Sequence, residues 1–174
     1  MAQFSNFPAA TDSDYENATT FLIQNTNGDT RLANLSGLNN NIFGDIQTTF
    51  LTILSANILT LNSVPVELIA AQGAGTTIEI MSVSVRATYK AAAYATNTNL
   101  QILTSGATNA QFDSASILTS TVNAHWKLAA NEPTIAGNTQ LIENAAVNVT
   151  VATGDPTAGN SDIEVYAMYR VIQL

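Results

Sequence analysis

The chain has 174 residues, of which 46% are apolar and only 10% are charged, and its net charge at neutral pH is −8. Nucleic-acid binding requires clustered cations that neutralise phosphates, and the five Lys and Arg residues are scattered, so we exclude nucleic acid as a partner. The acidity argues against docking on anionic lipid, and no apolar run reaches the roughly 18 residues of a spanning helix, so we expect no membrane contact.

The N-terminal part reads as an attachment segment. Residues 1–18 carry little periodicity but contain aromatic side chains. Thr19–Gln24 and Thr30–Asn34 alternate around a turn that contains Asn27-Gly28, which predicts a β-hairpin. An isolated hairpin is marginal in water, so this one needs a partner surface or further copies of itself. We predict that residues 1–48 form an attachment arm and hairpin, with candidate contacts Phe4, Phe7, Pro8, Phe21, Leu22 and Leu32.

Residues 49–174 read as a second domain built of β-strands. Its dominant element is Thr76–Tyr89, in which side chains alternate over the whole length. Ser55 is placed to cap one turn of helix, and Pro65 belongs at a strand start or a sheet edge. The segments Ser105–Ser114 and Gly154–Asn160 are predicted loops. The other predicted strands are Phe50–Leu54, Val64–Ala70, Asn97–Thr104, an irregular strand in Ala115–Leu128, Thr139–Ile142, Ala146–Ala152 and Asp162–Gln173.

This succession of short strands fixes the fold class that we expect. Roughly seven or eight strands with short turns and scant helical signal are what two packed antiparallel sheets require. We therefore predict an all-β fold, an antiparallel β-sandwich of jelly-roll-like form, with a small N-terminal hairpin and arm. The pattern leaves open which strands pair.

Few residues offer chemistry. Cysteine is absent, which removes disulfides, thiolate metal ligands and a cysteine nucleophile, and His125 is the one histidine. For His125-Trp126-Lys127 we weigh a ligand contact, with Trp126 as a stacking platform, against an aromatic anchor that fills a corner of the sandwich while His125 faces solvent. We favour the anchor, because one histidine without cysteine cannot build a zinc site unless carboxylates are recruited.

Two pairs of aspartates invite comparison with calcium loops. Asp12 and Asp14 lack the glycine and the distant glutamate of an EF-hand. Asp155 and Asp162 flank a loop rich in Gly, Pro and Asn and could hold calcium together with backbone carbonyls. We favour turn roles for both pairs, because aspartate is a natural turn residue.

A catalytic pair of carboxylates is the remaining enzymatic possibility. Glycoside hydrolysis needs two acids roughly 5–9 Å apart, and Glu67, Glu79 and Glu164 all lie in predicted strands. Glu79 and Glu164 are the pair most able to meet, although their spacing does not single them out. We predict no catalytic residue, no metal, no cofactor and no enzymatic activity.

Two parts of the sequence resemble structural proteins of tailed bacteriophages. The segment 50–103 resembles a module recurrent in these virion proteins, and 154–172 resembles its close. The matching residues are Leu54, Ile58, Leu59, Leu61, Asn62, Pro65, Leu68, Ala71, Gly73, Gly75, Tyr94–Leu100, Gly154, Pro156 and Gly159. The N-terminal part resembles the attachment region of phage fibres and spikes, through Phe7–Ala10, Thr20–Gln24 and Gly28–Leu38. Neither resemblance implies a catalytic residue.

The resemblance implies a structural role in the virion. We expect a capsid decoration protein or short head fibre, a homotrimer that attaches by its N-terminal segment to the major capsid protein or another virion protein. The alternative is a tail-associated receptor-binding fibre tip that recognises a host surface glycan. The N-terminus lacks the basic and apolar regions of a signal peptide, and cysteine is absent, so we expect assembly in the host cytoplasm and localisation in the virion.

Overall fold

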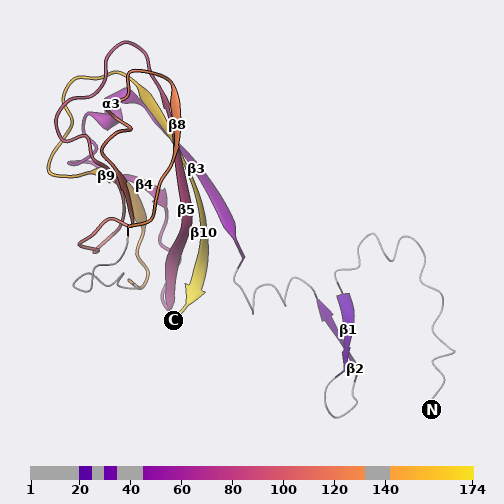
Figure 1. Ribbon diagram of the computed structural model, residues 1–174. Helices are drawn as coiled ribbons and strands as arrows, with labels where there is room; N and C mark the ends of the chain where they lie inside the picture. The colour runs from indigo at the N-terminus through magenta and orange to yellow at the C-terminus, as the bar shows by residue number, and fades with distance from the viewer. Residues whose placement is uncertain (1–19, 25–29, 35–44, 132–141) are drawn as a thin grey trace. The chain divides into compact units, whose positions relative to one another are not determined.

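The computed structural model describes residues 20–24, 30–34, 45–131 and 142–174 (Figure 1). Contacts within the chain divide it into two units, 1–45 and 46–174. In the first unit, β1 (Thr20–Gln24) and β2 (Thr30–Asn34) pair antiparallel, and Leu22 lies opposite Leu32 in the register. The predicted hairpin is thereby confirmed.

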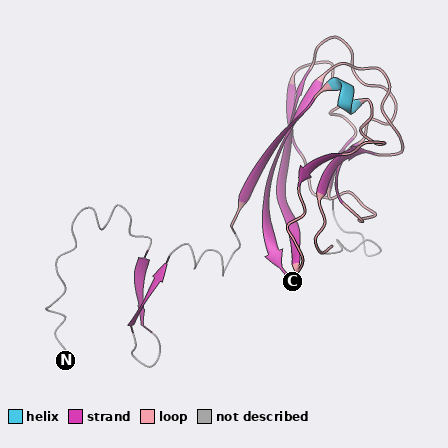
Figure 2. Cartoon of the chain, turned by 180° about the vertical axis from the view of Figure 1, so that it is seen from behind, coloured by secondary structure: helices cyan, strands magenta, loops and turns pink. Residues whose placement is uncertain are grey.

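The described residues of the second unit form two four-stranded sheets and one short helix, as Figure 2 shows by colour. One sheet has the strand order β3-β10-β5-β8 and the other has the order β4-β9-β6-β7. Every pairing is antiparallel. The elements are β3 (Gln47–Ile53), α3 (Ser55–Ile58), β4 (Val66–Ile69), β5 (Thr76–Thr88), β6 (Leu100–Thr104), β7 (Phe112–Ser114), β8 (Ala124–Lys127), β9 (Val147–Val151) and β10 (Asp162–Gln173).

The pairing pattern is that of a jelly roll. The first strand of the unit pairs with the last (β3 with β10), the second with the seventh (β4 with β9), the third with the sixth (β5 with β8), and the fourth with the fifth (β6 with β7). The chain is thus one long hairpin rolled up on itself, closed by the pairs β5–β10 and β6–β9. This confirms the predicted antiparallel β-sandwich and supplies the strand order that the sequence left open.

The core lies between the two sheets. Branched aliphatic side chains from both inner faces are fully buried there, among them Val85 and Val165 from one sheet and Ile102 and Val149 from the other. Burial of each such side chain contributes about 1.5–3 kcal/mol to folding. Branched side chains also favour extended backbone, so the same residues specify the strands and the core.

A β-bulge interrupts the long strand β5. Met168 of β10 pairs with Ser82, but the next residue, Tyr169, pairs with Ile80, so Met81 has no partner in the register and its side chain is exposed. An extra residue in one strand reverses which side chains face inward. The predicted uninterrupted alternation of this strand is therefore wrong. Before the bulge the even-numbered side chains of β5 face the core, and after it the odd-numbered ones do, since Ile78 and Val83 are both buried.

The structure corrects the cap of the short helix. Leu54, not Ser55, occupies the N-cap position of α3, and no side chain caps the helix. The Ser55 N–H instead donates to Asp162 Oδ1 at 2.9 Å, across 107 residues of sequence. A carboxylate from the last strand therefore satisfies a free donor at the helix start.

Several strand limits also differ from the prediction. β3 begins at Gln47 rather than at Phe50, β7 lies inside the segment predicted as the loop Ser105–Ser114, and only Ala124–Lys127 of the predicted irregular strand is extended and paired. The predicted strand Thr139–Ile142 falls outside the described residues except for Ile142, which is not in a strand. Pro65 directly precedes β4, an edge strand, as predicted.

Candidate interaction face

The surface of sheet β3-β10-β5-β8 that is turned away from the core has an apolar centre. We call it the outer face. Phe50 is 53% exposed, and Tyr166 and Met168 are 41% exposed each, although all three are large apolar side chains. Hydroxyl and imidazole groups surround them. The residues in the centre of the outer face are Thr48, Phe50, Ser82, Ser84, His125, Tyr166 and Met168.

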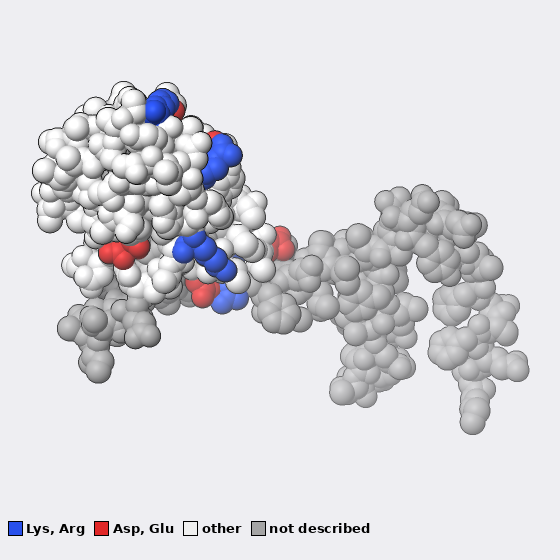
Figure 3. All heavy atoms as spheres, turned by 45° about the horizontal axis from the view of Figure 1, so that its top comes forward, with Lys and Arg blue, Asp and Glu red and all other residues white. Residues whose placement is uncertain are grey.

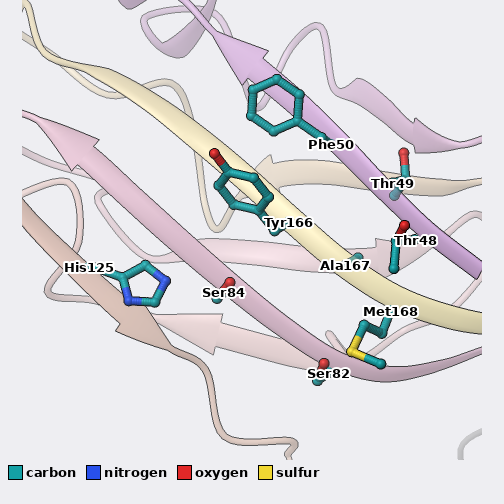
Figure 4. A pocket seen from close by; sticks show the side chains of 9 residues that line it. All are labelled: Thr48, Thr49, Phe50, Ser82, Ser84, His125, Tyr166, Ala167 and Met168. Carbon is teal, nitrogen blue, oxygen red and sulfur yellow. The ribbon is translucent and has the colours of Figure 1, made fainter.

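Strand alternation and register together build this centre. Thr48 and Phe50 occupy the positions of β3 that point away from the core, and Tyr166 and Met168 do the same on β10. Phe50 lies directly opposite Tyr166, and their ring centroids are 4.8 Å apart with 35° between the ring planes. Figure 4 shows the two rings side by side on neighbouring strands. Such a cross-strand aromatic pair contributes roughly 0.2–1 kcal/mol to the sheet.

The centre of the outer face is slightly hollowed, with a volume of about 490 Å³. Its lining provides two aromatic rings, a thioether, hydroxyls and one imidazole. Such a surface favours apolar packing with a few hydrogen bonds over recognition of a charged ligand.

An ion pair stands at each end of the outer face. Arg86 lies opposite Glu164 and holds it with two contacts, Nε to Oε2 at 2.6 Å and Nη2 to Oε1 at 2.8 Å. Arg170 lies opposite Glu79 and pairs with it at the other end. Glu164 and Arg170 lie six positions apart on β10, which is roughly 20 Å at about 3.4 Å per residue. The expectation that Glu79 and Glu164 are the acids most able to meet is therefore wrong.

Charged side chains are few on the face of the molecule that Figure 3 shows. A third ion pair joins Lys90 to Asp162 at 2.7 Å. The hydrogen bond from Lys90 lowers the pKa of the Asp162 carboxyl, and the Ser55 N–H acts in the same direction. Asp162 therefore serves the structure as an anchor for β10, the helix and the loop after β5.

The segment that begins at Tyr94 and the loop before β10 interlock. Tyr94 is 3% exposed, and its hydroxyl donates to the Ser161 carbonyl at 2.6 Å. Burial, together with the nearby Asp162 carboxylate, raises the pKa of the Tyr94 phenol. Gly159 passes so close to the ring that no side chain fits between them. Tyr94 and Gly159 are residues that carry the phage resemblance, and the structure brings them into contact.

Asn97 and Asp155 fasten the same two segments. Asn97 adopts a positive φ of 46°, which asparagine tolerates better than most residues, and its Nδ2 donates to the Asp155 carbonyl at 3.0 Å. The Asp155 carboxylate accepts the N–H groups of Asn62 and Ser63 at 2.8 and 2.9 Å and the Ser63 hydroxyl at 2.7 Å. The hydrogen bonds from Ser63 lower the pKa of Asp155. We call this arrangement of 94–99 and 153–161 the loop lock.

The residues that the sequence analysis weighed as possible ligand or metal sites make structural contacts instead. Asp155 and Asp162 hold N–H, hydroxyl and ammonium groups rather than facing each other across a calcium site. Trp126 packs against the core and His125 is exposed, which is the arrangement expected of an aromatic anchor. Within the described part of the chain, no group of three or more His, Asp or Glu side chains could hold a metal ion. Asp12 and Asp14 lie outside that part.

The predicted attachment residues are placed only in part. Phe21, Leu22 and Leu32 lie on β1 and β2, and their role in attachment stays a prediction. Three further candidates, Phe4, Phe7 and Pro8, lie outside the described residues. No helix among the described residues is long and apolar enough to cross a membrane.

Sequence reasoning missed the outer face, although its signal is present. β3 and β10 carry apolar residues at outward positions as well as inward ones: Phe50 next to Leu51, and Tyr166 and Met168 next to Val165 and Ala167. A strand with one face in water normally alternates apolar and polar residues, whereas apolar residues on both faces indicate a strand that is covered on both sides.

Comparisons with known proteins give one structural likeness. No family model matches the chain, and no curated protein sequence matches it. Among solved structures it is similar to a chain of the cyanophage Pam1 capsid asymmetric unit, with 16% sequence identity and a TM-score of 0.44. The match covers 74% of this chain and 86% of that chain. The assignment of function therefore depends on the residues of this chain.

Proposed function

We propose that this chain is a structural protein of a tailed-phage virion, either a capsid decoration protein or a short head fibre. In this proposal the N-terminal segment attaches the chain to the major capsid protein or another virion protein, and the jelly roll is displayed outward in a homotrimer. The observation that carries the proposal is the sequence resemblance in 50–103 and 154–172. Its residues coincide with the loop lock, because Tyr94, Asn97 and Gly159 are among them.

This coincidence supports a resemblance in the residues that hold the loops in place and not in a catalytic site. Gly159 is needed for its close approach to the Tyr94 ring, and Asn62 donates its N–H to Asp155 and its Nδ2 to the Val151 carbonyl. These residues hold loops in place. Jelly rolls occur in viral capsid domains and in lectins, so the fold alone leaves both structural and sugar-binding roles open.

The surface chemistry also fits a repetitive assembly. Charged residues are 10% of the chain against roughly 25% in ordinary soluble domains, so copies can pack with little like-charge repulsion. Attachment of several copies to one particle multiplies weak contacts into avidity without any new kind of contact. The proposed mechanism is therefore adhesion through burial of apolar surface.

The receptor-binding alternative would need aromatic side chains on exposed loops. The two most exposed aromatic side chains among the described residues, Phe50 and Tyr166, lie instead within strands of a sheet face. This placement favours a protein–protein contact over a sugar cleft, and we retain decoration or head-fibre function as the proposal.

We also propose that the chain has no enzymatic activity. The best candidate carboxylates for glycoside hydrolysis are Glu79 and Glu164. Each of them pairs with an arginine, and the two lie roughly 20 Å apart along the sheet. A retaining or inverting mechanism needs them within about 10 Å. Incubation with host polysaccharide should release no reducing sugar. Release by the purified chain that disappears in Glu164→Gln would move the protein to the enzyme class.

Attachment is tested with purified particles that lack this protein. The full chain is compared with a chain lacking 1–44, because the second unit begins at Ile46 and β3 at Gln47. The full chain should decorate the particles, and the truncated chain should stay folded but unbound. Normal occupancy by the truncated chain would show that attachment does not use the N-terminal segment.

A point variant sharpens this test. Phe7→Ser removes one predicted contact, and loss of a buried aromatic side chain should weaken binding per copy roughly 10- to 100-fold. Val64→Ser is the matched control, since Val64 is an exposed apolar residue of the second unit. Electron microscopy of the decorated particles then locates the bound chains. A position on the tail would contradict the capsid assignment.

A further inference from the structure

We propose that the outer face is buried against a second copy of this chain, with Phe50, Tyr166 and Met168 at the centre of the contact. The inference goes beyond the proposed function, because a face that meets an identical face joins chains in two-fold pairs, through a contact distinct from the one that would hold a homotrimer. It is tested in solution without particles, so its failure and the failure of virion attachment can be told apart.

The first argument is the apolar character of β3 and β10 on both faces. Leu51 packs against the core and Val165 lies within it, yet the alternate positions carry Phe50, Tyr166 and Met168. These side chains expose a contiguous apolar centre on one sheet, which costs solvation free energy in an isolated chain. A covering partner removes that cost.

The second argument is the free edge of the same sheet. β3 is an edge strand of seven residues without charge or proline, so its outer backbone groups are open to pairing. The other sheet edges carry protection: β7 has three residues, β8 has four, and β4 has four with Pro65 before it and an irregular register. The unprotected edge and the apolar centre adjoin at Phe50.

The third argument is the charge pattern, and it favours a second copy as the partner. The apolar centre of the outer face carries no charge, each end carries a closed ion pair, Arg86 with Glu164 and Arg170 with Glu79, and Lys127 points outward at the margin, on the edge strand β8 opposite Ser84. When an identical face is turned end to end and laid on this one, each ion pair lies against the ion pair at the other end of the second copy. Acids then face arginines across the contact, while Lys127 at the margin can keep its ammonium group in water.

Shape and size agree with that partner. Two sheets with the same twist pack face to face at about −30°, as the two layers of a sandwich do, so a copy of this sheet supplies a matching surface. The four strands hold 7, 12, 13 and 4 residues, and at about 3.3 Å per residue and about 4.8 Å between strands they form a face of roughly 570 Å². Contact over the whole face would bury roughly 1,100 Å² in total, which exceeds the roughly 1,000 Å² expected of a biological interface.

The solution mass of the full chain tests the proposal. Native mass spectrometry and sedimentation at micromolar concentration should show an even number of chains, because the proposed contact joins chains in pairs. Phe50→Ser and Tyr166→Ser should each weaken self-association roughly 10- to 100-fold, because each removes a buried aromatic side chain from the contact. Val64→Ser, at a position that is 62% exposed and lies outside the outer face, should leave self-association unchanged. Urea unfolding of each variant verifies that it is folded.

Methionine oxidation gives a readout without mutation. Met168 lies on the outer face, and burial in a contact should slow its oxidation by peroxide as the protein concentration rises. A monomeric wild-type chain, equal weakening in Val64→Ser, or oxidation of Met168 at a rate independent of concentration would each overturn the proposal. Protection that arises only when particles or host glycans are added would assign the outer face to a different partner and would overturn it too.

Discussion

Replacement of Gly159 by alanine should destabilise the second unit because the loop lock has no room for a side chain. A Cβ atom at Gly159 would lie 2.4 Å from Cδ1 and 2.5 Å from Cγ of Tyr94. Tyr94 cannot easily swing away, since it is buried and its hydroxyl is bound to the Ser161 carbonyl. Either the ring or the loop must shift.

The expected cost has two parts. Gly159 has a φ of +82°, where an L-residue costs about 1–2 kcal/mol, and insertion of an extra methyl group into a packed site costs about 1–3 kcal/mol. The sum is about 2–5 kcal/mol. A substitution at Gly75 measures the backbone cost without the steric cost. Gly75 has a φ of +75°, and a Cβ atom added there would meet nothing within 4 Å. Gly75→Ala should therefore cost only the backbone part, about 1–2 kcal/mol.

Urea unfolding of both variants at one protein concentration measures the difference. Gly159→Ala should have the lower midpoint, and the gap between the two variants reports the clash with Tyr94 alone. Equal free energies of unfolding for the two variants would refute the reasoning, since the contact with the ring would then carry no cost.

Three further outcomes are expected. Tyr94→Phe leaves the Ser161 carbonyl without its buried donor and should lower the free energy of unfolding by about 1–3 kcal/mol, measured in urea. Ile53→Ala opens a cavity in the core and should cost about 2–5 kcal/mol by the same measurement. Asp162→Asn should be less stable than wild type at pH 7, because Lys90 lowers the pKa of the folded carboxyl. That stability is present above the ordinary Asp pKa of about 3.9 and is lost as the pH falls through the lower folded value, so the two proteins should converge in strongly acidic buffer. A difference that persists there would show that the ion pair is not its source.

The sequence predicts a strand best where the alternation of its side chains and the residues at its ends indicate the same limits. β10 has the predicted limits, because its alternating apolar residues follow a loop of Gly, Asn and Pro that cannot extend the strand. β5 is likewise placed to within one residue at its end. In both, local pattern and tertiary burial point the same way, so the prediction needs no knowledge of the partner strands.

Other features depend on contacts that are distant in sequence. β7 lies in a stretch of small polar residues, and its position follows from burial of Phe112 and pairing with β6. The bulge at Met81 exists only relative to β10. The donor at Ser55 is satisfied by Asp162 far along the chain, where a rule for local capping cannot find it. These features become visible only when the pairing of strands is known.

The jelly roll also connects the two halves of the proposed function. It places the first and last strands of the second unit side by side, and β3 follows the N-terminal unit almost directly. The strand that carries Phe50 and the unprotected edge is therefore the strand to which the attachment segment is joined. Association of copies through the outer face, with the copies turned end to end, would place the two junctions at opposite ends of one contact, so both attachment segments would belong to a single tethered pair of chains. The affinity of the assembly would then exceed that of one segment, because each further contact forms within a tethered complex.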